Sequence, residues 1–261
     1  MIKKKSLSSG LIITLGILVL VFLYFPVAVV FIYSFNSDTI NSFPMGGFSF
    51  KWYGSLFQNR ELMTSLLNSL KVALAGTAIA VIVGVPAAYG MHRVHFPGKQ
   101  LLNRIVILPM MLPGVITGIA ILAFIQEAGI RQGMGAVILG HATFLLGTVL
   151  PQVYTRLRQL DKSLEEAATD LGATEVQTFF QVVLPNIKTS IIGAALLSVT
   201  LSMDEIPVTY FLNGTFTTLP IKILGMTRNN FSPEVNAICS IILILSVAAI
   251  VASVAMNKKE V

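Results

Sequence analysis

The chain has 261 residues, of which 54% are hydrophobic and only 11% are charged, and its mean hydropathy is +0.80. Soluble domains carry about 25% charged residues, so this composition excludes an ordinary soluble protein and predicts an all-α, multi-pass membrane protein. The net charge of +6 does not indicate a nucleic-acid partner, because the basic residues are dispersed around apolar segments. The single cysteine excludes an internal disulfide and a cysteine-based metal site.

Six segments are apolar over the length of about 20 residues that a spanning helix needs. They are residues 11–35, 65–91, 105–124, 134–154, 191–212 and 235–256. The first follows three lysines and resembles a signal peptide at its start. Its apolar core is too long for one and no small-residue cleavage site follows, so we expect a retained span.

The distribution of Lys and Arg predicts the orientation of these spans. With the N-terminus in the cytoplasm, twelve basic residues lie on that side and six on the other. Both termini are therefore expected to be cytoplasmic. The cytoplasmic set is Lys3, Lys4, Lys5, Arg93, Lys99, Arg104, Arg156, Arg158, Lys162, Lys188, Lys258 and Lys259.

The loop between the first two spans, residues 36–64, is expected to face outside. It combines Trp52 and Tyr53 with turn residues. It either lies on the membrane surface or contacts a partner protein, and the sequence leaves both open. In the third span, Pro109, Pro113 and Gly114 predict a break, although proline and glycine are common in membrane helices.

Residues 163–185 form a charged, amphipathic segment, named here the EAA segment, on the side predicted to be cytoplasmic. Ser163 and Glu166 have the spacing of a capping box, and so do Thr174 and Gln177. Gly172 predicts a left-handed helix end between them. We expect two short helices joined at Gly172 and closed by Pro185, each with an apolar stripe.

Two interpretations of the EAA segment fit this pattern. An amphipathic helix can lie flat among the lipid headgroups. The acidic polar face and the sharp turn at Gly172 favour instead a loop that docks into another protein.

The same segment resembles the EAA loop of ATP-binding-cassette (ABC) importer permeases. The family pattern is EAA, three residues, Gly, nine residues, an aliphatic residue, one residue and Leu-Pro. Glu166 to Pro185 keeps every spacing, with Val182 in place of the usual isoleucine. The resemblance implies the type I importer permease fold, with a cytoplasmic coupling loop at 156–188 that binds a separate ATPase. The residues it assigns to coupling are Glu165, Glu166, Ala167, Ala168, Asp170, Gly172, Ala173, Phe179, Leu184 and Pro185.

Further stretches resemble spermidine/putrescine-type permeases over most of the chain: residues 201–205, 218–221 and 232–237, together with Asn36 and residues 140–144. This similarity implies one permease domain over residues 1–261 in the bacterial inner membrane. It also implies three partners: a second, PotB-like permease, an ATPase dimer that binds ATP and Mg²⁺, and a periplasmic binding protein. Permeases for other small amines or organic solutes, such as aminophosphonates or amino acids, share much of the pattern.

Two adjacent carboxylates, Asp204 and Glu205, lie in the fifth apolar segment just before Pro207. A charge inside a span is costly unless it faces water, protein or a partner charge. We predict that Asp204 and Glu205, with Met203 and Tyr210, lie on the pathway of a cationic substrate. The alternatives are an ion pair with a partner subunit or a position near the outer interface. His141 in the fourth span is expected to form a packing hydrogen bond.

Several absences limit the chemistry that this chain can perform. It contains no G-x-x-x-x-G-K-[ST] sequence for nucleotide phosphates, and neither H-E-x-x-H nor G-x-S-x-G. We therefore expect no enzyme activity, no catalytic residue, no metal and no cofactor in this chain, with the energy supplied by the ATPase. A stand-alone channel or secondary carrier is the main alternative, but it would have no use for a coupling loop.

Overall fold

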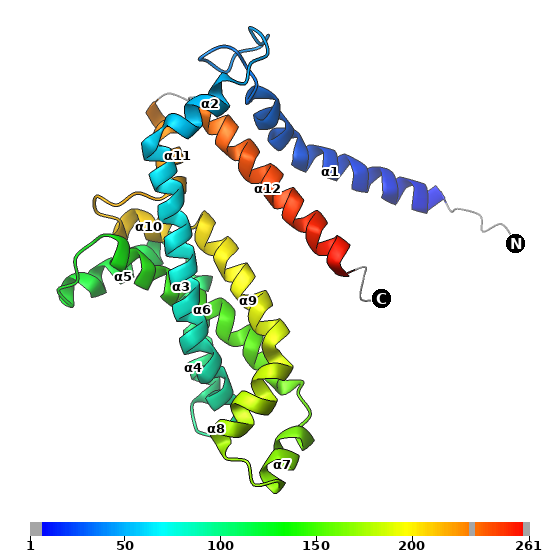
Figure 1. Ribbon diagram of the computed structural model, residues 1–261, viewed down its shortest axis with the longest axis vertical. Helices are drawn as coiled ribbons and strands as arrows, with labels where there is room; N and C mark the ends of the chain where they lie inside the picture. Colours follow the sequence, from blue (N-terminus) through cyan, green and yellow to red (C-terminus); the bar gives the residue numbers. More distant parts are fainter. Residues whose placement is uncertain (1–6, 230–232, 258–261) are drawn as a thin grey trace, which may run out of the picture. The chain divides into compact units, whose positions relative to one another are not determined.

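A computed structural model describes residues 7–229 and 233–257, and the regular elements within these ranges are helices (Figure 1). They are α1 (Leu7–Tyr33), α2 (Lys51–Gln58), α3 (Arg60–Arg93), α4 (Lys99–Met111), α5 (Gly114–Glu127), α6 (Met134–Arg158), α7 (Ser163–Asp170), α8 (Glu175–Thr178), the π-helical turn η1 (Phe179–Val183), α9 (Leu184–Asp204), α10 (Pro207–Leu212), α11 (Leu219–Asn229) and α12 (Pro233–Asn257). The all-α prediction is confirmed for the described residues.

Four of the described helical stretches are long and apolar enough to cross a membrane: Gly10–Tyr33, Arg60–Arg93, Met134–Arg158 and Glu175–Asp204. The pair α4–α5 makes a fifth if it counts as one span, although it bends by 108° at its break. The predicted segment 235–256 lies within α12. Six spans and cytoplasmic termini therefore stay predictions, and Lys3, Lys4, Lys5, Lys258 and Lys259 lie outside the described residues.

The third and fifth predicted spans are not straight helices. In the third, Leu112 is extended at ψ 149° and Pro113 follows, because proline disfavours helical geometry in the residue before it. In the fifth, the predicted range 191–212 is wrong at both ends. The helix already runs from Glu175 and stops at Asp204, ahead of Pro207.

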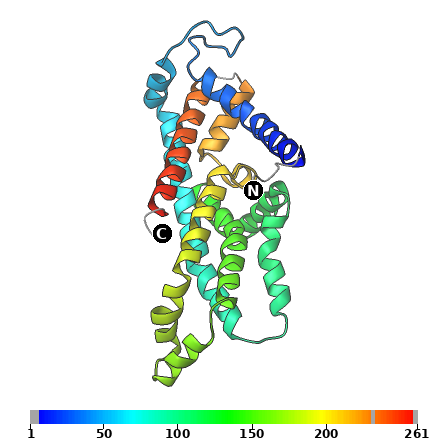
Figure 2. The same cartoon turned by 90° about the vertical axis from the view of Figure 1, so that its right-hand side faces the viewer.

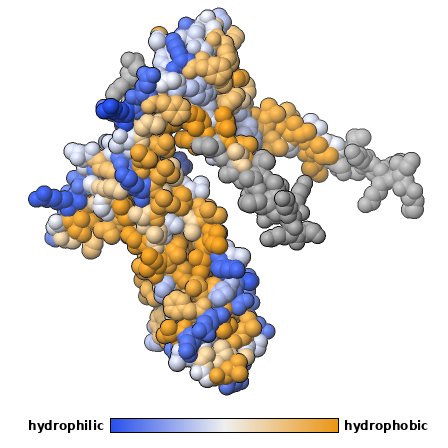
Figure 3. All heavy atoms as spheres, in the orientation of Figure 1, coloured by the Kyte–Doolittle hydropathy of each residue, from blue (hydrophilic) through white to orange (hydrophobic). Residues whose placement is uncertain are grey.

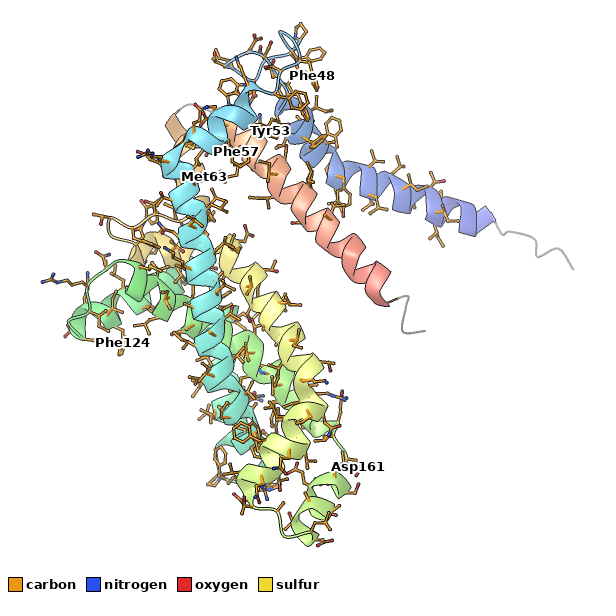
Figure 4. The ribbon with its side chains drawn as sticks, viewed as in Figure 1. Phe48, Tyr53, Phe57, Met63, Phe124 and Asp161 are labelled. Carbon is orange, nitrogen blue, oxygen red and sulfur yellow. The ribbon has the colours of Figure 1, made fainter. Side chains whose placement is uncertain are left out.

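The chain divides into two compact units, Met1–Met63 with Ile223–Val261, and Thr64–Lys222. In the first unit, Phe35 stacks on Phe48 with ring centroids 4.8 Å apart, and Ser34 hydrogen-bonds to Tyr53 over 2.7 Å. Figure 4 shows Phe48 and Tyr53 close to the start of α2. The Asn59 side chain donates to Glu234 of α12 over 3.0 Å. The predicted outer loop of residues 36–64 therefore contains α2 and the start of α3, and its Phe48 and Tyr53 pack against Phe35, just after α1.

The second unit has its apolar core where α6 packs against α3 and α9, and Figure 2 shows α6 between α4 and α9. Small residues allow the helices to approach closely. A Cβ added at Gly76 would lie 3.2 Å from the Cβ of His141, and one at Gly84 would lie 3.1 Å from Val149. The core cluster includes Ala80, Ala88, Leu145, Val149, Val153, Leu157, Val183 and Ile187.

The surface of the second unit changes character toward the α7–α8 end. In Figure 3, apolar side chains cover the visible face of α3 and α9, and polar side chains gather around the ends of these helices nearest α7 and α8. Exposed apolar residues on the long helices include Leu74, Ile82, Ile192 and Leu196. This pattern fits a membrane-embedded body that carries the EAA segment at one of its polar ends.

Candidate functional site

Gly172 forms the predicted left-handed turn in the EAA segment. Its φ is +83°, its amide donates to the Thr169 carbonyl over 2.9 Å, and the Ala173 amide donates to the Ala168 carbonyl over 3.0 Å. These two bonds define the Schellman motif at a helix end. A Cβ at Gly172 would have nothing within 4 Å. The glycine is therefore required by its backbone angle and not by space.

The first predicted capping box is wrong. The helix α7 already includes Ser163, so its N-cap residue is Lys162. The Lys162 side chain makes no capping hydrogen bond. Instead the Ser163 amide donates to the carboxylate of Asp161 over 3.0 Å, and Figure 4 shows Asp161 at the entrance to α7. This backbone bond, with one from the Ser163 side chain, holds the pKa of Asp161 below its ordinary value. A carboxylate two residues upstream thus takes the role expected of the hydroxyl.

The second capping box is confirmed, but Pro185 does not close the segment. The Gln177 amide donates to Thr174 Oγ1 over 3.3 Å, and the Thr174 amide donates to Gln177 Oε1 over 2.8 Å. The helix then continues through η1 into α9. Pro185 is tolerated because it follows a wider π-helical turn. The Asn186 side chain also donates to the Val182 carbonyl over 2.7 Å. The EAA segment is thus continuous with a spanning helix.

Glu165 and Glu166 point to different surroundings. The Glu165 carboxylate is 15% exposed and lies 3.9 Å from His92 Nε2 and 4.0 Å from Arg93 Nε, at the end of α3. Tyr89 donates to the same carboxylate over 3.4 Å. Glu166 is exposed, and no described residue hydrogen-bonds or ion-pairs with its side chain. Glu165 therefore binds within its own chain, and Glu166 is free to bind another protein.

The apolar residues of the EAA segment are divided in the same way. Ala168, Thr178 and Val183 are buried, and Phe179 packs on Tyr89 with ring centroids 4.8 Å apart. In contrast, Leu171 is 89% exposed. Other exposed residues of the segment include Leu164, Ala167, Asp170, Val176, Phe180 and Pro185, while Ala173 and Leu184 are half-buried. Exposed leucine and phenylalanine in the same segment as the exposed Glu166 give it the composition of a protein-binding site.

The acidic pair lies at the break between α9 and α10. Asp204 is the last residue of α9 and is exposed, and among the described residues none hydrogen-bonds or ion-pairs with its carboxylate. Glu205 is half-buried and accepts the Val208 amide over 3.0 Å, so it caps the first turn of α10. Met203 is half-buried, and Tyr210 is 54% exposed. The two carboxylates therefore have different surroundings.

His141 joins three helices at this break. Its Nδ1 lies 2.6 Å from Ser202 Oγ in α9, and its Nε2 lies 2.8 Å from Thr209 Oγ1 in α10. The Thr209 hydroxyl already donates to the Glu205 carbonyl over 2.9 Å. Nε2 must therefore carry a hydrogen and donate to Thr209, while Nδ1 of the neutral ring accepts from Ser202. The expected packing hydrogen bond of His141 is confirmed, and it holds the α9–α10 break on α6.

Glycines on α5 and α6 let α10 pack closely beside this break. A Cβ at Gly118 would lie 2.7 Å from Phe211 and 3.1 Å from the Pro207 carbonyl, and one at Gly140 would lie 2.4 Å from Leu212. After α5, the Gln132 side chain donates to the Phe211 carbonyl over 2.8 Å. The helix α10, which follows Asp204, therefore packs closely against α5 and α6.

Sequence reasoning missed the contacts between distant segments. Glu165 reaches Arg93, and Arg93 also lies 3.5 Å from Glu175. The charge pattern alone signals only that Arg93 is basic and near a span end.

No group of three His, Cys, Asp or Glu side chains that could hold a metal ion occurs in residues 7–229 and 233–257.

Comparison with known proteins identifies the family. A family profile described as binding-protein-dependent transport system inner membrane component matches residues 76–258. The spermidine/putrescine transport system permease protein PotC of Haemophilus influenzae is 33% identical over 240 residues, which cover 92% of this chain and 93% of that protein. The putrescine transport system permease protein PotI of Escherichia coli is 37% identical over 85% of this chain and 82% of its own length.

Solved structures agree on the fold. A bacterial ABC transporter involved in import of the acidic polysaccharide alginate has a chain that superposes with a TM-score of 0.73 at 17% identity, covering 99% of this chain and 98% of its own. A chain of the MetNI methionine ABC transporter gives a TM-score of 0.60 at 18% identity over 74% of this chain and 92% of its own. The predicted importer permease fold is confirmed. The chain belongs to the family of inner-membrane components of binding-protein-dependent ABC transport systems.

Proposed function

We propose that this chain is the PotC-like permease subunit of a polyamine importer and carries a spermidine- or putrescine-like cation across the inner membrane. The similarity to PotC over 92% of the chain carries this proposal. The chain would act as one permease domain over residues 1–261, with six spans and both termini in the cytoplasm. Its partners would be a PotB-like permease, an ATPase dimer that binds ATP and Mg²⁺, and a periplasmic binding protein.

In this mechanism the EAA segment docks on the ATPase through the surface around Glu166 and Leu171. ATP-driven movement of that surface reaches α9 directly, because the segment continues into α9 through η1. The α9–α10 break at Asp204 lies at the other end of α9. A free carboxylate there offers a charge-assisted hydrogen bond to a protonated amine. The mechanism therefore uses α9 as the link between ATP hydrolysis and the substrate cavity.

The complex of four protein types, reconstituted in liposomes, tests this function. We expect the binding protein loaded with spermidine or putrescine to stimulate ATP hydrolysis and drive uptake of the labelled polyamine. Stimulation by an aminophosphonate or an amino acid instead would reassign the substrate. Uptake by the purified chain alone, without the ATPase, would contradict the importer mechanism and favour a channel or carrier.

The turn at Gly172 gives a prediction about coupling. Gly172→Val should uncouple ATP hydrolysis from uptake, because a β-branched residue is strained at φ +83°. Gly172→Asn is the matched control, since asparagine tolerates this region and nothing lies within 4 Å of the new Cβ. We expect the valine variant to insert and assemble but to lose most uptake per ATP hydrolysed. Equal coupling in both variants would remove Gly172 from the mechanism.

The two glutamates give a second prediction. Glu166→Ala should lower the affinity for the ATPase by one to two decades and so weaken its co-purification. This loss corresponds to about 1.5–3 kcal/mol for the charge-assisted hydrogen bond of a docked carboxylate. Glu165→Ala removes only contacts to His92, Arg93 and Tyr89 of its own chain. It should lower the stability of the permease by about 1 kcal/mol and leave docking nearly intact. A reversed order in pull-down and thermal unfolding would show that the roles are exchanged.

A further inference from the structure

A hollow of ≈ 480 Å³ lies where the ends of α3 and α6 meet the beginning of α4. We call it the basic pocket. Its lining carries a set of basic or amide side chains and no carboxylate: His92, His95, Lys99, Gln100, Asn103, Arg158 and Lys162. Three permanent cations from three separate segments converge there. Such convergence is unfavourable unless an anion balances it.

The cations of the basic pocket are not neutralised within the described chain. No described carboxylate forms an ion pair with Lys99, Arg158 or Lys162. Lys99 is nonetheless held inward, because its Nζ donates to the Val94 carbonyl over 3.3 Å and lies 5.7 Å from the centre of the Tyr154 ring. The Glu165 carboxylate lies 3.9 Å from His92 of the pocket, but it is shared with Arg93. The pocket therefore keeps a positive excess.

Two further features of the pocket suit a phosphate that carries a hydroxyl group. The helix α4, which has 13 residues, begins here without a side-chain cap after Gly98, so its first amides favour a negative group. Asn103, one turn into α4, has a buried Oδ1 with no hydrogen-bond partner. A turn of the Asn103 carboxamide toward the pocket would satisfy this acceptor if the ligand there is anionic and also donates a hydrogen bond.

The surroundings favour a lipid over a soluble phosphate. Beside the pocket, α4 exposes Leu102, which lies one turn from Lys99 on the same side of the helix. An acyl chain can pack on Leu102 while the headgroup occupies the pocket. The cationic lining also lies on the side that the distribution of Lys and Arg predicts to be cytoplasmic, where basic pockets between spanning helices bind anionic headgroups.

We propose that the basic pocket binds the headgroup of an anionic phospholipid with a free hydroxyl group, such as phosphatidylglycerol. Lys99, Arg158 and Lys162 bind the phosphate, and the Asn103 side chain turns so that its Oδ1 accepts a hydrogen bond from a headgroup hydroxyl. The bound lipid is also linked to the EAA segment, because His92 of the pocket lies 3.9 Å from the Glu165 carboxylate. A bound lipid thus joins the ends of α3, α4 and α6 next to the segment that binds the ATPase.

Native mass spectrometry of the whole complex, titrated with phosphatidylglycerol or with phosphatidylcholine, tests this site. Lys99→Gln combined with Arg158→Gln should weaken phosphatidylglycerol binding by about 25-fold, roughly fivefold for each cation removed. The matched control is Lys71→Gln combined with Lys188→Gln, which removes the same charge from two exposed positions outside the pocket. The control should bind like the wild type. Equal binding by both double variants would overturn the proposal.

Two further measurements distinguish the lipid from two alternative ligands of the pocket, a soluble phosphate and the ATPase. Displacement of the lipid by millimolar inorganic phosphate, or equal binding of glycerophosphoglycerol without acyl chains, would assign the pocket to a soluble phosphate and overturn the lipid. Loss of the ATPase from the variant complex with unchanged lipid binding would assign the cations to that protein instead. If the double variant does not assemble, Arg158→Gln and Asn103→Val are measured singly. Each should lose roughly fivefold in phosphatidylglycerol binding, and no loss in either would overturn the site.

Discussion

Asp204→Asn is expected to lower polyamine uptake by one to two decades while the complex assembles and hydrolyses ATP at its basal rate. Asparagine keeps the shape of the side chain but removes the charge that a protonated amine would bind, a contribution of about 1.5–3 kcal/mol. Asp204 has no partner among the described residues, so the substitution breaks no internal bond. The measurement is initial uptake at several polyamine concentrations, with complex integrity followed in the same sample.

Two control variants define what the loss would mean. Glu127→Gln removes the same charge from an exposed position at the end of α5 and should leave uptake unchanged. Glu205→Gln keeps an oxygen that can accept the Val208 amide, so it should have a smaller effect than Asp204→Asn. Full uptake by Asp204→Asn would contradict a cation site at this residue. Loss of assembly would identify Asp204 as an ion-pair partner of another subunit.

His141→Leu is expected to give the second large effect. Leucine fills part of the imidazole volume but leaves the buried Ser202 hydroxyl without its acceptor, at about 1–3 kcal/mol for an unsatisfied group. The Thr209 hydroxyl loses the donor Nε2 but keeps its own bond to the Glu205 carbonyl. Both groups hold the ends of α9 and α10 beside Asp204. We expect at least tenfold lower uptake and a lower thermal midpoint for the assembled complex.

Two amide variants distinguish the two hydrogen bonds of His141. Glutamine places an N–H donor near the position of Nε2 and preserves the bond to Thr209, whereas asparagine reaches only the position of Nδ1 and preserves the bond to Ser202. If the attachment of α10 matters most, His141→Gln should retain more uptake than His141→Asn at equal assembly. Wild-type uptake and thermal midpoint in His141→Leu would refute the role of this residue at the break.

The apolar segments and the spacing of the EAA segment were predictable from the sequence because each depends on residues close together in the chain. Lipid requires long apolar runs, and the left-handed turn requires a glycine at position 172. The same holds for the capping box at Thr174, which needs only two residues three positions apart.

The errors arose where several local solutions compete or where distant residues meet. Ser163 has the right spacing for a cap, but Asp161 is a stronger acceptor and takes that role. Pro185 ends many helices, but a π-helical turn ahead of it removes the conflict. The pairing of Glu165 with Arg93 joins residues 72 positions apart, and no periodicity in either helix indicates it.

The π-helical turn η1 also fixes an angular relation between the two ends of the helix that it interrupts. A π turn holds one residue more than the α-helical path it replaces, and each residue of an α-helix advances the azimuth by about 100°. The faces of α8 and α9 are therefore out of phase by about that angle, compared with an uninterrupted helix. Because α8, η1 and α9 form one continuous helix, a rotation of α8 would reach Asp204 with this fixed offset. The length of a single turn thus determines which side of α9 lies in line with the exposed Val176 and Phe180.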